Sequence, residues 1–457
     1  MWGDFNLLRV NMKRVLIVIS IIILIAYMAI SALMLSRHGY LGGGYTLRGQ
    51  VMERADSAIT QAIDQGEFPG AVLCVVRRAL DGESMGRILY LKAYGNRQVA
   101  SGRDESGEWI ADTLPMTTDA VFDLASLSKS VGTTLAFMRL VENGQVRLTD
   151  NVSHYIPDFK PWESTPQKRN ERVEREHITI KHLLTHTSGL PAGVNVPSFI
   201  ERYSEKGDIE QMNLRDSLVR YIATEAKRRT RPDEKMTYSC LNFVTLQAII
   251  ENVTGQRLDH FLQREIFGPM QLTNTWYNAI DEQSPFIADT PIVPTEVQAD
   301  GKILYGEVHD PIARILNRGV SGNAGLFSTA EDLAALASMI MNGGVIRIDK
   351  DGLQGRVGAN ERVRILSEAA VKAMMQIPSE YDEFGRTLGW DSGFFGDLAT
   401  REQSINHTGY TGTSMSIDNE RGVAVILLTS RVHPQDNGSL ARTRAVVSNI
   451  VLSALDK

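Results

Sequence analysis

The sequence predicts an α+β fold, an α/β sandwich in which one antiparallel sheet is built from both chain ends and flanked by helices. Two strand-like runs, "GAVLCVV" (70–76) and "RILYLKAYG" (87–95), follow a helical pattern over residues 51–65. Near the other end, "GTSMSID" and "VAVILLTS" flank the turn "NERG" and predict a hairpin, before a terminal helix over about residues 437–455. Because helix–strand–strand opens the pattern and strand–strand–helix closes it, we expect both ends to share one sheet.

The middle of the chain carries helix signals and predicts a mostly helical insertion over about residues 125–400. The segment "TIKHLLTHTSG" (179–189) begins at a threonine that can cap a helix and ends at Ser-Gly. The segment "STAEDLAALASMIMNGG" (328–344) opens with Ser-x-x-Glu, the pattern of a capping box, and ends on glycines. The charged segment 160–177 predicts a surface loop.

An apolar segment near the start, residues 15–35, predicts a transmembrane helix. Its 21 residues carry no charge, and at about 1.5 Å per residue they would span about 31 Å, enough for a bilayer core. A cleaved signal peptide is the alternative, but its apolar region would be about 7–15 residues long and would end in a small-x-small site. Basic residues precede the segment (Arg9, Lys13, Arg14) and favour a cytoplasmic N-terminus.

The predicted organisation therefore has three parts. They are a cytoplasmic tail with a transmembrane signal anchor (1–36), a flexible glycine-rich linker (37–50) and one large domain (51–457). The predicted location is the cell (inner) membrane, as a single-pass protein whose large domain lies in the periplasm or outside the cell.

Composition excludes some classes of protein. The 457 residues are 43% hydrophobic and 22% charged, with a net charge of −6, and no basic stripe supports a nucleic-acid partner. The two cysteines, Cys74 and Cys240, are too few for a disulfide scaffold. Cys74 lies in a strand-like run and is expected to be inert packing.

The stretch "DLASLSKSVG" (123–132) contains the chain's one S-x-x-K pattern, Ser126 with Lys129. On a helix, positions i and i+3 share a face, so the serine hydroxyl and the lysine amine can meet. Ser128 and Ser130 lie about 200° and 40° around from Ser126, and neither has a lysine three residues on. Serine needs an adjacent base to act as a nucleophile, and a lysine qualifies when burial or a cationic neighbour lowers its pKa.

Further motifs follow in order along the chain. "KMTYSCLNF" (235–243) contains Tyr238, and "INHTGYTGTS" (405–414) contains the His-Thr-Gly triplet that begins at His407. "HLLTHTSGLP" (182–191) lies between the S-x-x-K pattern and Tyr238, and "NAGLFSTAEDLA" (323–334) lies between Tyr238 and His407. Together these motifs resemble the serine β-lactamase-like and penicillin-binding protein superfamily, in its class C β-lactamase and esterase branch. The resemblance covers about residues 51–455.

The resemblance implies catalytic roles at the matching positions. Ser126 would form the acyl-enzyme, and Lys129 would take or stabilise its proton. Tyr238 would relay a proton to the leaving group, and the third-motif strand would present His407 to the substrate. The backbone N–H groups of Ser126 and Tyr410 would form the oxyanion hole.

Two positions depart from the family pattern. The family's Tyr-x-Asn is here Tyr-Ser-Cys, so Cys240 stands where asparagine would bind a substrate amide, and Asn242 lies two residues further on. The third motif has His407 in place of lysine, and a mostly neutral imidazole attracts a carboxylate less than an ammonium does. Thr408 and Gly409 complete the expected substrate-binding residues, with Cys240 and Tyr410. Esters, amides or peptides are therefore expected substrates rather than β-lactams.

The sequence predicts a membrane-anchored serine hydrolase that needs no cofactor or metal. Its substrate would be a small molecule or peptide, with peptidoglycan fragments among the candidates, and its membrane contact would be residues 15–35. A non-catalytic penicillin-binding or sensor protein of the same fold is the alternative. His182 and His186 have the i, i+4 spacing of a zinc helix, but Leu183 replaces the glutamate of H-E-x-x-H.

Overall fold

The computed structural model describes residues 45–456, apart from residues 81–85, 169–170, 205–212, 287–288, 349–360 and 437. Within this part of the chain, no helix combines the length and the apolar character that crossing a bilayer requires. The predicted location as a single-pass inner-membrane protein therefore has no support in the structure, and we correct it. The predicted anchor, residues 15–35, lies outside the described residues.

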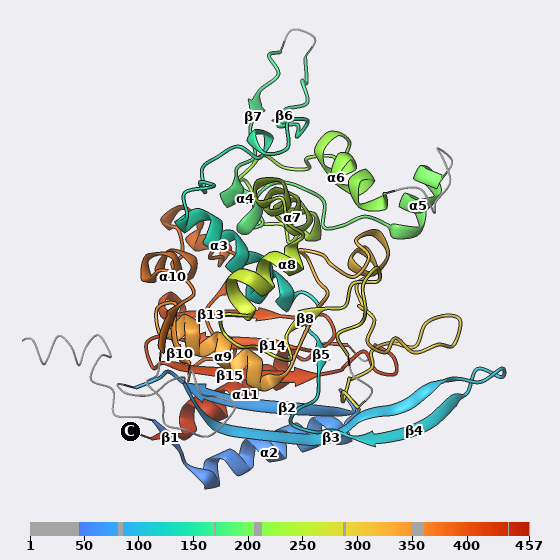
Figure 1. The fold of residues 1–457 in the computed structure, drawn as a ribbon, viewed down its shortest axis with the longest axis vertical. Coiled ribbons are helices and arrows are strands. Elements are labelled where there is room, and N and C mark those ends of the chain that lie inside the picture. Colours follow the sequence, from blue (N-terminus) through green and yellow to red (C-terminus); the bar gives the residue numbers. More distant parts are fainter. Residues whose placement is uncertain are drawn as a thin grey trace, which may run out of the picture.

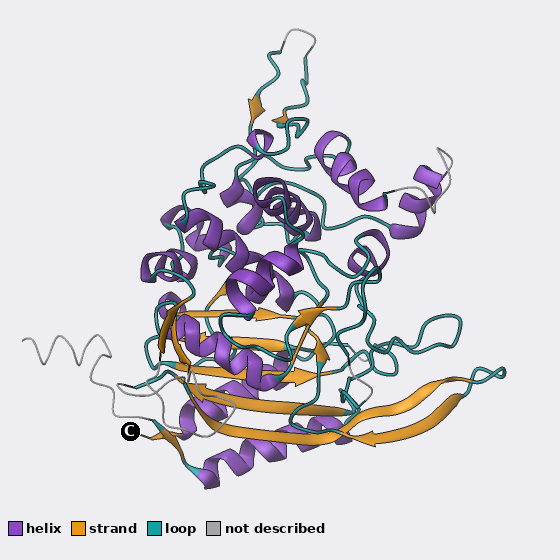
Figure 2. Cartoon of the chain, in the orientation of Figure 1, coloured by secondary structure: helices purple, strands orange, loops and turns teal. Residues whose placement is uncertain are grey.

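A seven-stranded antiparallel sheet forms the base of the molecule (Figures 1 and 2). In spatial order its strands are β12 (Asp391–Ser392), β13 (Ser404–Thr408), β14 (Ser414–Asp418), β15 (Val423–Thr429), β2 (Gly70–Arg77), β3 (Arg87–Arg103) and β4 (Trp109–Pro115). The last strand of the chain's C-terminal hairpin, β15, pairs with the first long strand, β2, with Val425 opposite Val75. This confirms the predicted mixed fold with a large antiparallel sheet.

Strand β2 is buried on both faces, and its side chains alternate between two cores. Leu73 and Val75 face a core that includes residues of α2 (Gly49–Asp64) and α11 (Ala441–Ala454). Val72 and Cys74 face the larger core, which includes α9 and the helical region. Burial raises the pKa of the Cys74 thiol to about 12, which agrees with its predicted role as inert packing.

The helical region lies between β4 and β12 in sequence and covers one side of the sheet (Figure 2). Its α-helices are α3 (Leu135–Glu142), α4 (Ile180–Leu184), α5 (Val196–Ser204), α6 (Leu214–Thr224), α7 (Cys240–Thr254), α8 (Leu258–Leu262), α9 (Ala330–Met341) and α10 (Glu368–Met375). Single π-helical turns lie at Lys129–Thr134, Gln263–Phe267 and Ile312–Leu316, and 3₁₀ turns at Val152–His154, Ser379–Phe384 and Arg401–Gln403.

Smaller strand pairs complete the fold. A three-stranded sheet has the order β5 (Phe122–Asp123), β9 (Leu326–Ser328) and β8 (Trp276–Tyr277). Two-stranded pairs are β1 (Thr46–Leu47) with β16 (Leu455–Asp456), β6 (Trp162–Glu163) with β7 (Arg175–Glu176), and β10 (Val345–Ile348) with β11 (Glu361–Arg364). The pair β6–β7 lies in the predicted surface loop and projects from the helical region (Figure 1).

Helix caps agree with the sequence in one case and differ by one residue in another. Thr179 caps α4 and shares a reciprocal capping box with His182. The predicted capping residue of α9, Ser328, is instead the last residue of β9 and pairs with Phe122. Thr329 takes its place and accepts from the backbone of Asp332 at 3.3 Å.

Candidate active site

The turn between β5 and the first π-helical segment carries Ser126. Ala125 adopts a positive φ of 45°, an uncommon backbone conformation for a residue with a side chain. The buried carboxylate of Asp123 accepts from the backbone N–H of Ala125 at 2.8 Å and from that of His309 at 2.7 Å. Between Ala120 and Met138, Ser126 alone is not buried. The turn therefore leaves the Ser126 hydroxyl partly exposed, while the residues on either side of it are buried.

The two neighbouring serines have structural contacts instead. Ser128 is buried and its Oγ accepts from the backbone N–H of Leu326 at 3.1 Å. Ser130 is also buried, and its Oγ donates to the carbonyl of Gly389 at 2.6 Å. The geometry therefore distinguishes Ser126 from both of them.

Lys129 is fully buried, at 0% exposure, and its Nζ donates to Ser126 Oγ at 3.0 Å. The same Nζ donates to the carbonyl of Asn323 at 2.7 Å. The two residues of the S-x-x-K pattern are thus in direct contact, although the backbone between them begins a π-helical turn rather than a regular α-helix. The Asn323 carbonyl therefore helps to hold the Lys129 amine in place. The sequence alone does not identify this contact.

The pKa of Lys129 is raised above its ordinary value. Burial works to lower the pKa, but interactions with Cys240 and Tyr238 and the charge of Asp310 outweigh it. Lys129 is therefore an ammonium at neutral pH. This differs from the expectation that burial would leave it a neutral base, because neighbouring groups that can carry negative charge stabilise the cation.

Tyr238 lies in the loop before α7, with its side chain 37% exposed. Its ring centroid is 5.0 Å from Lys129 Nζ and 6.2 Å from the ring centroid of His407. Tyr238 therefore lies close to both the S-x-x-K pair and the third motif. The fold brings together three segments that are far apart in the sequence.

His407 is buried at the end of strand β13, and its Nδ1 lies 2.8 Å from the carbonyl of Thr408. Because a carbonyl only accepts, Nδ1 carries the proton and Nε2 presents a lone pair. That Nε2 has no hydrogen-bond partner among the described residues. Burial lowers the pKa of His407 to about 3, with Arg386 and Lys129 acting in the same direction. His407 is therefore a neutral acceptor at physiological pH.

The loop after β13 is hydrogen-bonded to the turn that carries Ser126. Thr411 donates to the carbonyl of Asp123 at 2.7 Å, and Thr413 donates to that of Leu124 at 3.0 Å. A Cβ on Gly409 would lie 2.3 Å from the carbonyl oxygen of Leu124, so only glycine permits this approach. The loop after the third motif therefore packs directly against the turn that carries Ser126.

The two proposed oxyanion donors are free in the described part of the chain. Neither the backbone N–H of Ser126 nor that of Tyr410 donates to another described residue. Tyr410 is 56% exposed, and its ring stacks on that of His309 at a centroid distance of 5.6 Å. Its hydroxyl donates to Asp436 at 2.6 Å. The stacking on His309 and the hydrogen bond to Asp436 thus hold the exposed Tyr410 side chain in place.

Cys240 and Asn242 lie at the start of α7 but have different surroundings. The Cys240 thiol interacts with Lys129 and Asn323, and burial raises its pKa despite the lysine. Asn242 is fully buried and is bonded to Ser188 and His186. It therefore does not supply the amide that Cys240 lacks.

The two histidines at zinc-helix spacing direct their rings to different partners. His182 accepts from the backbone of Thr179 at 3.0 Å and contacts Asp233 at 3.1 Å. The ring of His186 contacts Ser239 and Asn242. The hypothesis of a shared metal therefore has no geometric support. In the described residues, one close group of potential ligands is Asp259, His260 and Glu282, and Arg257 forms ion pairs with both of its acidic members.

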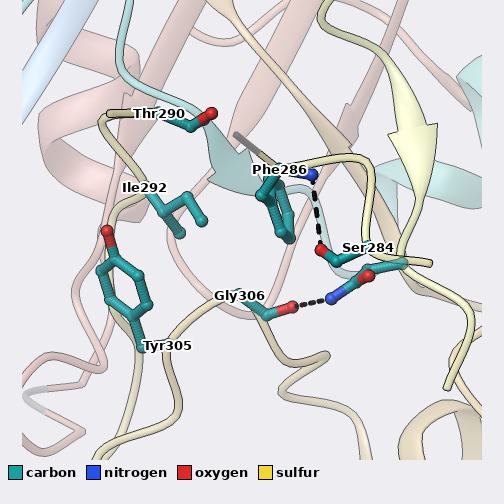
Figure 3. Close-up of a pocket in the computed structure, with 7 residues that line it drawn as sticks. Ser284, Phe286, Thr290, Ile292, Tyr305 and Gly306 are labelled. Carbon is teal, nitrogen blue, oxygen red and sulfur yellow. Dashed lines mark hydrogen bonds between the residues drawn. The ribbon is translucent and has the colours of Figure 1, made fainter. Parts of the chain in front are cut away.

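A cavity of about 310 Å³ is a separate feature of the structure (Figure 3). It is lined by Asn278, Ser284, Phe286, Thr290, Ile292, Tyr305 and Gly306. Asn278 donates across it to the carbonyl of Gly306 at 2.7 Å. None of its lining residues is a predicted site residue, so we assign it no part in the chemistry.

Comparison with known proteins agrees with this geometry. A family model described as Beta-lactamase matches residues 36–449. The chain belongs to the β-lactamase family. The predicted family is thereby confirmed, and so is the predicted class of enzyme, a serine hydrolase.

Two relatives are similar to this chain over most of its length. The chain is 31% identical over 410 residues to an N-acetylmuramyl-L-alanine amidase of Bacillus subtilis (strain 168), which covers 84% of the chain and 83% of the relative. It is 28% identical over 418 residues to a putative D-alanyl-D-alanine carboxypeptidase of Escherichia coli (strain K12), with 85% of each covered.

Among solved structures, the hydrolase EstCE1, described as having promiscuous acyltransferase activity, has a TM-score of 0.60 at 23% identity, with 88% of this chain and 98% of that chain covered. A penicillin-binding protein homologue from Pyrococcus abyssi has a TM-score of 0.56 at 20% identity, with 84% and 74% covered. At these identities the structures show a shared fold only.

Proposed function

We propose that this protein hydrolyses an ester, amide or peptide bond through an acyl-enzyme on Ser126. The observation that carries the proposal is the 3.0 Å contact between Ser126 Oγ and the buried Nζ of Lys129. Ser126 is also the one residue of its buried stretch that is open to a substrate. Nucleophile and activating group within hydrogen-bond reach are the signature of covalent catalysis.

The proton on Ser126 would pass to Tyr238 rather than to Lys129. Because the pKa of Lys129 is raised, its ammonium has no free electron pair with which to accept a proton. The ammonium lies 5.0 Å from the Tyr238 ring centroid, so its positive charge is close to the site of proton transfer. In this scheme the serine oxygen bonds to the acyl carbon and the bond to the leaving group breaks, while the Tyr238 hydroxyl receives the Ser126 proton as it gives its own proton to the leaving group.

Hydrolysis of the acyl-enzyme would follow the same route with water. The water oxygen bonds to the acyl carbon and the bond from that carbon to Ser126 Oγ breaks, while the Tyr238 hydroxyl receives a proton from water as it gives its own proton to Ser126 Oγ. The free backbone N–H groups of Ser126 and Tyr410 would hold the negative oxygen of each tetrahedral intermediate. Loss of one such donor typically costs about 100- to 1000-fold in rate.

Peptidoglycan-derived amides are the first substrate class to test, since two relatives bear names that refer to peptidoglycan amide or peptide cleavage. Simple esters are the second candidate, because of two features of this chain. Cys240 replaces a group that could bind an amide, since a thiol is a weak donor and acceptor. The neutral, lone-pair-bearing Nε2 of His407 does not attract a carboxylate.

The test is the intact mass of the purified protein after treatment with a fluorophosphonate probe. Wild type should gain one adduct and Ser126→Ala none. The matched controls Ser128→Ala and Ser130→Ala should label as wild type does, since their side chains contact only the backbone. A folded wild type that gains no adduct from this probe or from an acylating ester contradicts the proposal and favours a non-catalytic sensor.

A further inference from the structure

We propose that His186 is a positioning residue, which holds Tyr238 in place through its backbone carbonyl and the lone pair of its ring Nδ1. This inference rests on the proposed function, because it concerns the residue that would transfer the proton. His186 belongs to the histidine pair at zinc-helix spacing, which the proposed reaction does not otherwise use.

His186 contacts three successive residues around Tyr238. Its carbonyl accepts from the backbone N–H of Thr237 at 2.8 Å. Its Nδ1 accepts from the backbone N–H of Ser239 at 3.1 Å. Between these two bonds, its ring lies 4.5 Å from the ring of Tyr238, centroid to centroid, with an interplanar angle of 33°. One residue therefore holds the chain before and after Tyr238 and also contacts its ring.

The tautomer of His186 follows from its neighbours. Ser188 Oγ donates to Asn242 Oδ1 at 2.6 Å, which leaves the Nδ2 donor of Asn242 facing His186 Nδ1 at 3.1 Å. Nδ1 thus faces two donors, the amide of Asn242 and the backbone N–H of Ser239. It must present a lone pair to them, so the single ring proton lies on Nε2.

A neutral ring is also what the surroundings favour. His186 is fully buried, and burial lowers its pKa well below the ordinary value, with Arg386, Lys129 and His407 acting in the same direction. Protonation of Nδ1 would place an N–H against two other N–H groups and break both bonds. Asn242, two residues beyond Cys240, therefore acts on Tyr238 through His186 and not on the substrate amide.

The backbone of His186 adds a second constraint. Its φ of 60° lies in the left-handed region, which histidine and asparagine adopt more readily than most residues do. Asparagine also has a side-chain oxygen about where histidine has Nδ1. The substitution His186→Asn therefore keeps the acceptor and the backbone conformation, whereas His186→Leu and His186→Gln remove the acceptor from that position.

His182 provides the matched control. It precedes His186 by four residues, is also largely buried at 7% exposure, and also accepts from a backbone N–H through Nδ1. Its ring contacts Thr179 and Asp233, and no hydrogen bond joins it to residues 237–239 among those described. Replacing it should affect the stability of α4 and not the placement of Tyr238.

The experiment compares kcat and KM for an activated ester, together with the rate of fluorophosphonate labelling, in wild type, His186→Asn, His186→Gln, His186→Leu and His182→Asn. Displacing a catalytic group by about 1 Å can cost about 100-fold in rate. We therefore expect kcat and labelling to fall about 10- to 100-fold in His186→Gln and His186→Leu, with KM within about threefold, because Tyr238 acts in the chemical step. His186→Asn should recover most of the loss.

The outcomes separate this inference from the proposed function. Wild-type protein that is not labelled contradicts the acyl-enzyme and the inference with it. Labelling of wild type and of His186→Gln at equal rates overturns the inference alone, as does an equal loss in folded His186→Asn and His186→Gln, or in folded His182→Asn. Thermal unfolding of each variant identifies those that are folded, and the Asn–Gln pair decides the test if His186→Leu does not fold.

Discussion

The two sides of the candidate site are built in different ways. One side is the turn with Ser126 and Lys129, whose side chains are three residues apart and meet through local geometry, 3.0 Å from each other. The other side is formed by Tyr238 and His407, which are far apart in sequence and rely on partners elsewhere in the chain. The comparison shows that local spacing can predict a contact between two side chains, whereas contacts between residues far apart in the sequence depend on the tertiary fold.

The largest expected effect comes from removing the buried amine. Lys129→Met should lower the acylation rate by about 100- to 1000-fold, as expected when a preorganised charge is removed from a reacting centre, because Ser126 and Tyr238 both lose the buried cation beside them. Single-turnover labelling measures this rate. Lys92→Met is the control, since Lys92 forms an exposed ion pair with Asp56. A Lys129→Met variant that labels within threefold of wild type would exclude the lysine from the chemistry.

The next prediction tests the close approach of Gly409 to the Leu124 carbonyl, where the two sides of the site meet. Gly409→Ala should lower kcat by about 100-fold, as expected for a displaced oxyanion donor, because the added Cβ would meet the Leu124 carbonyl at 2.3 Å. Gly193→Ala is the control, since its Cβ would meet only Ile312 Cδ1 at 3.5 Å, an ordinary contact. Steady-state kinetics on an ester measures both. Equal activity of the two variants would show that the close approach is not required.

His407 makes the second side sensitive to acid. Its folded-state pKa of about 3 lies below the ordinary value of 6.5, so between these values the unfolded chain binds the proton and the folded protein does not. Stability is therefore highest above pH 6.5 and falls as the pH decreases toward 3, by up to about 1.4 kcal/mol per pH unit for one such group.

Urea unfolding at pH 7, 5.5 and 4 tests this pH dependence. His407→Asn should lose less stability over the range than wild type does. Parallel losses in the two proteins would refute the assignment of a neutral, buried imidazole. Because His407 in the folded protein is protonated only near pH 3, its protonation should not reduce activity near neutral pH.

The smallest effect on activity is expected for Ser128→Ala, in the turn that carries Ser126. Ser128→Ala removes the acceptor for the Leu326 N–H and should lower the free energy of unfolding by about 1–3 kcal/mol, the cost of an unsatisfied buried donor. Its labelling rate should stay within threefold of wild type. A loss of labelling as large as that of Ser126→Ala would remove the distinction between the two serines.

Much of this architecture could be predicted from the sequence. The apolar run "GAVLCVV" and the terminal hairpin pattern predict strands of the central sheet, since a short apolar run between turn signals is a local property of the sequence. The spacing of Ser126 and Lys129 predicted their contact for the same reason. Ser328 was assigned one residue too early as a cap, because its pairing with Phe122 in β9 is a tertiary contact.

Other features of the site could not be predicted from the sequence, because they depend on contacts between residues that are far apart in the chain. The segment "HLLTH" (182–186) has the spacing of a zinc pair, but the ring of His186 is bonded to Ser239 and Asn242, more than 50 residues later. Asn323 lay in a segment noted for its resemblance to the family, yet its carbonyl contact with Lys129 depends on folding. The raised pKa of Lys129 likewise depends on neighbours brought together by the fold. The division into tail, linker and catalytic domain stays a prediction.

The most direct test of the account is to locate the covalent bond. After brief incubation with an activated ester and acid quenching, peptide mapping by mass spectrometry identifies the acylated residue. The account predicts a single acyl group on Ser126, absent from Ser126→Ala and retained in Ser128→Ala and Ser130→Ala. An acyl group on another residue, with Ser126→Ala fully active, would contradict the central claim.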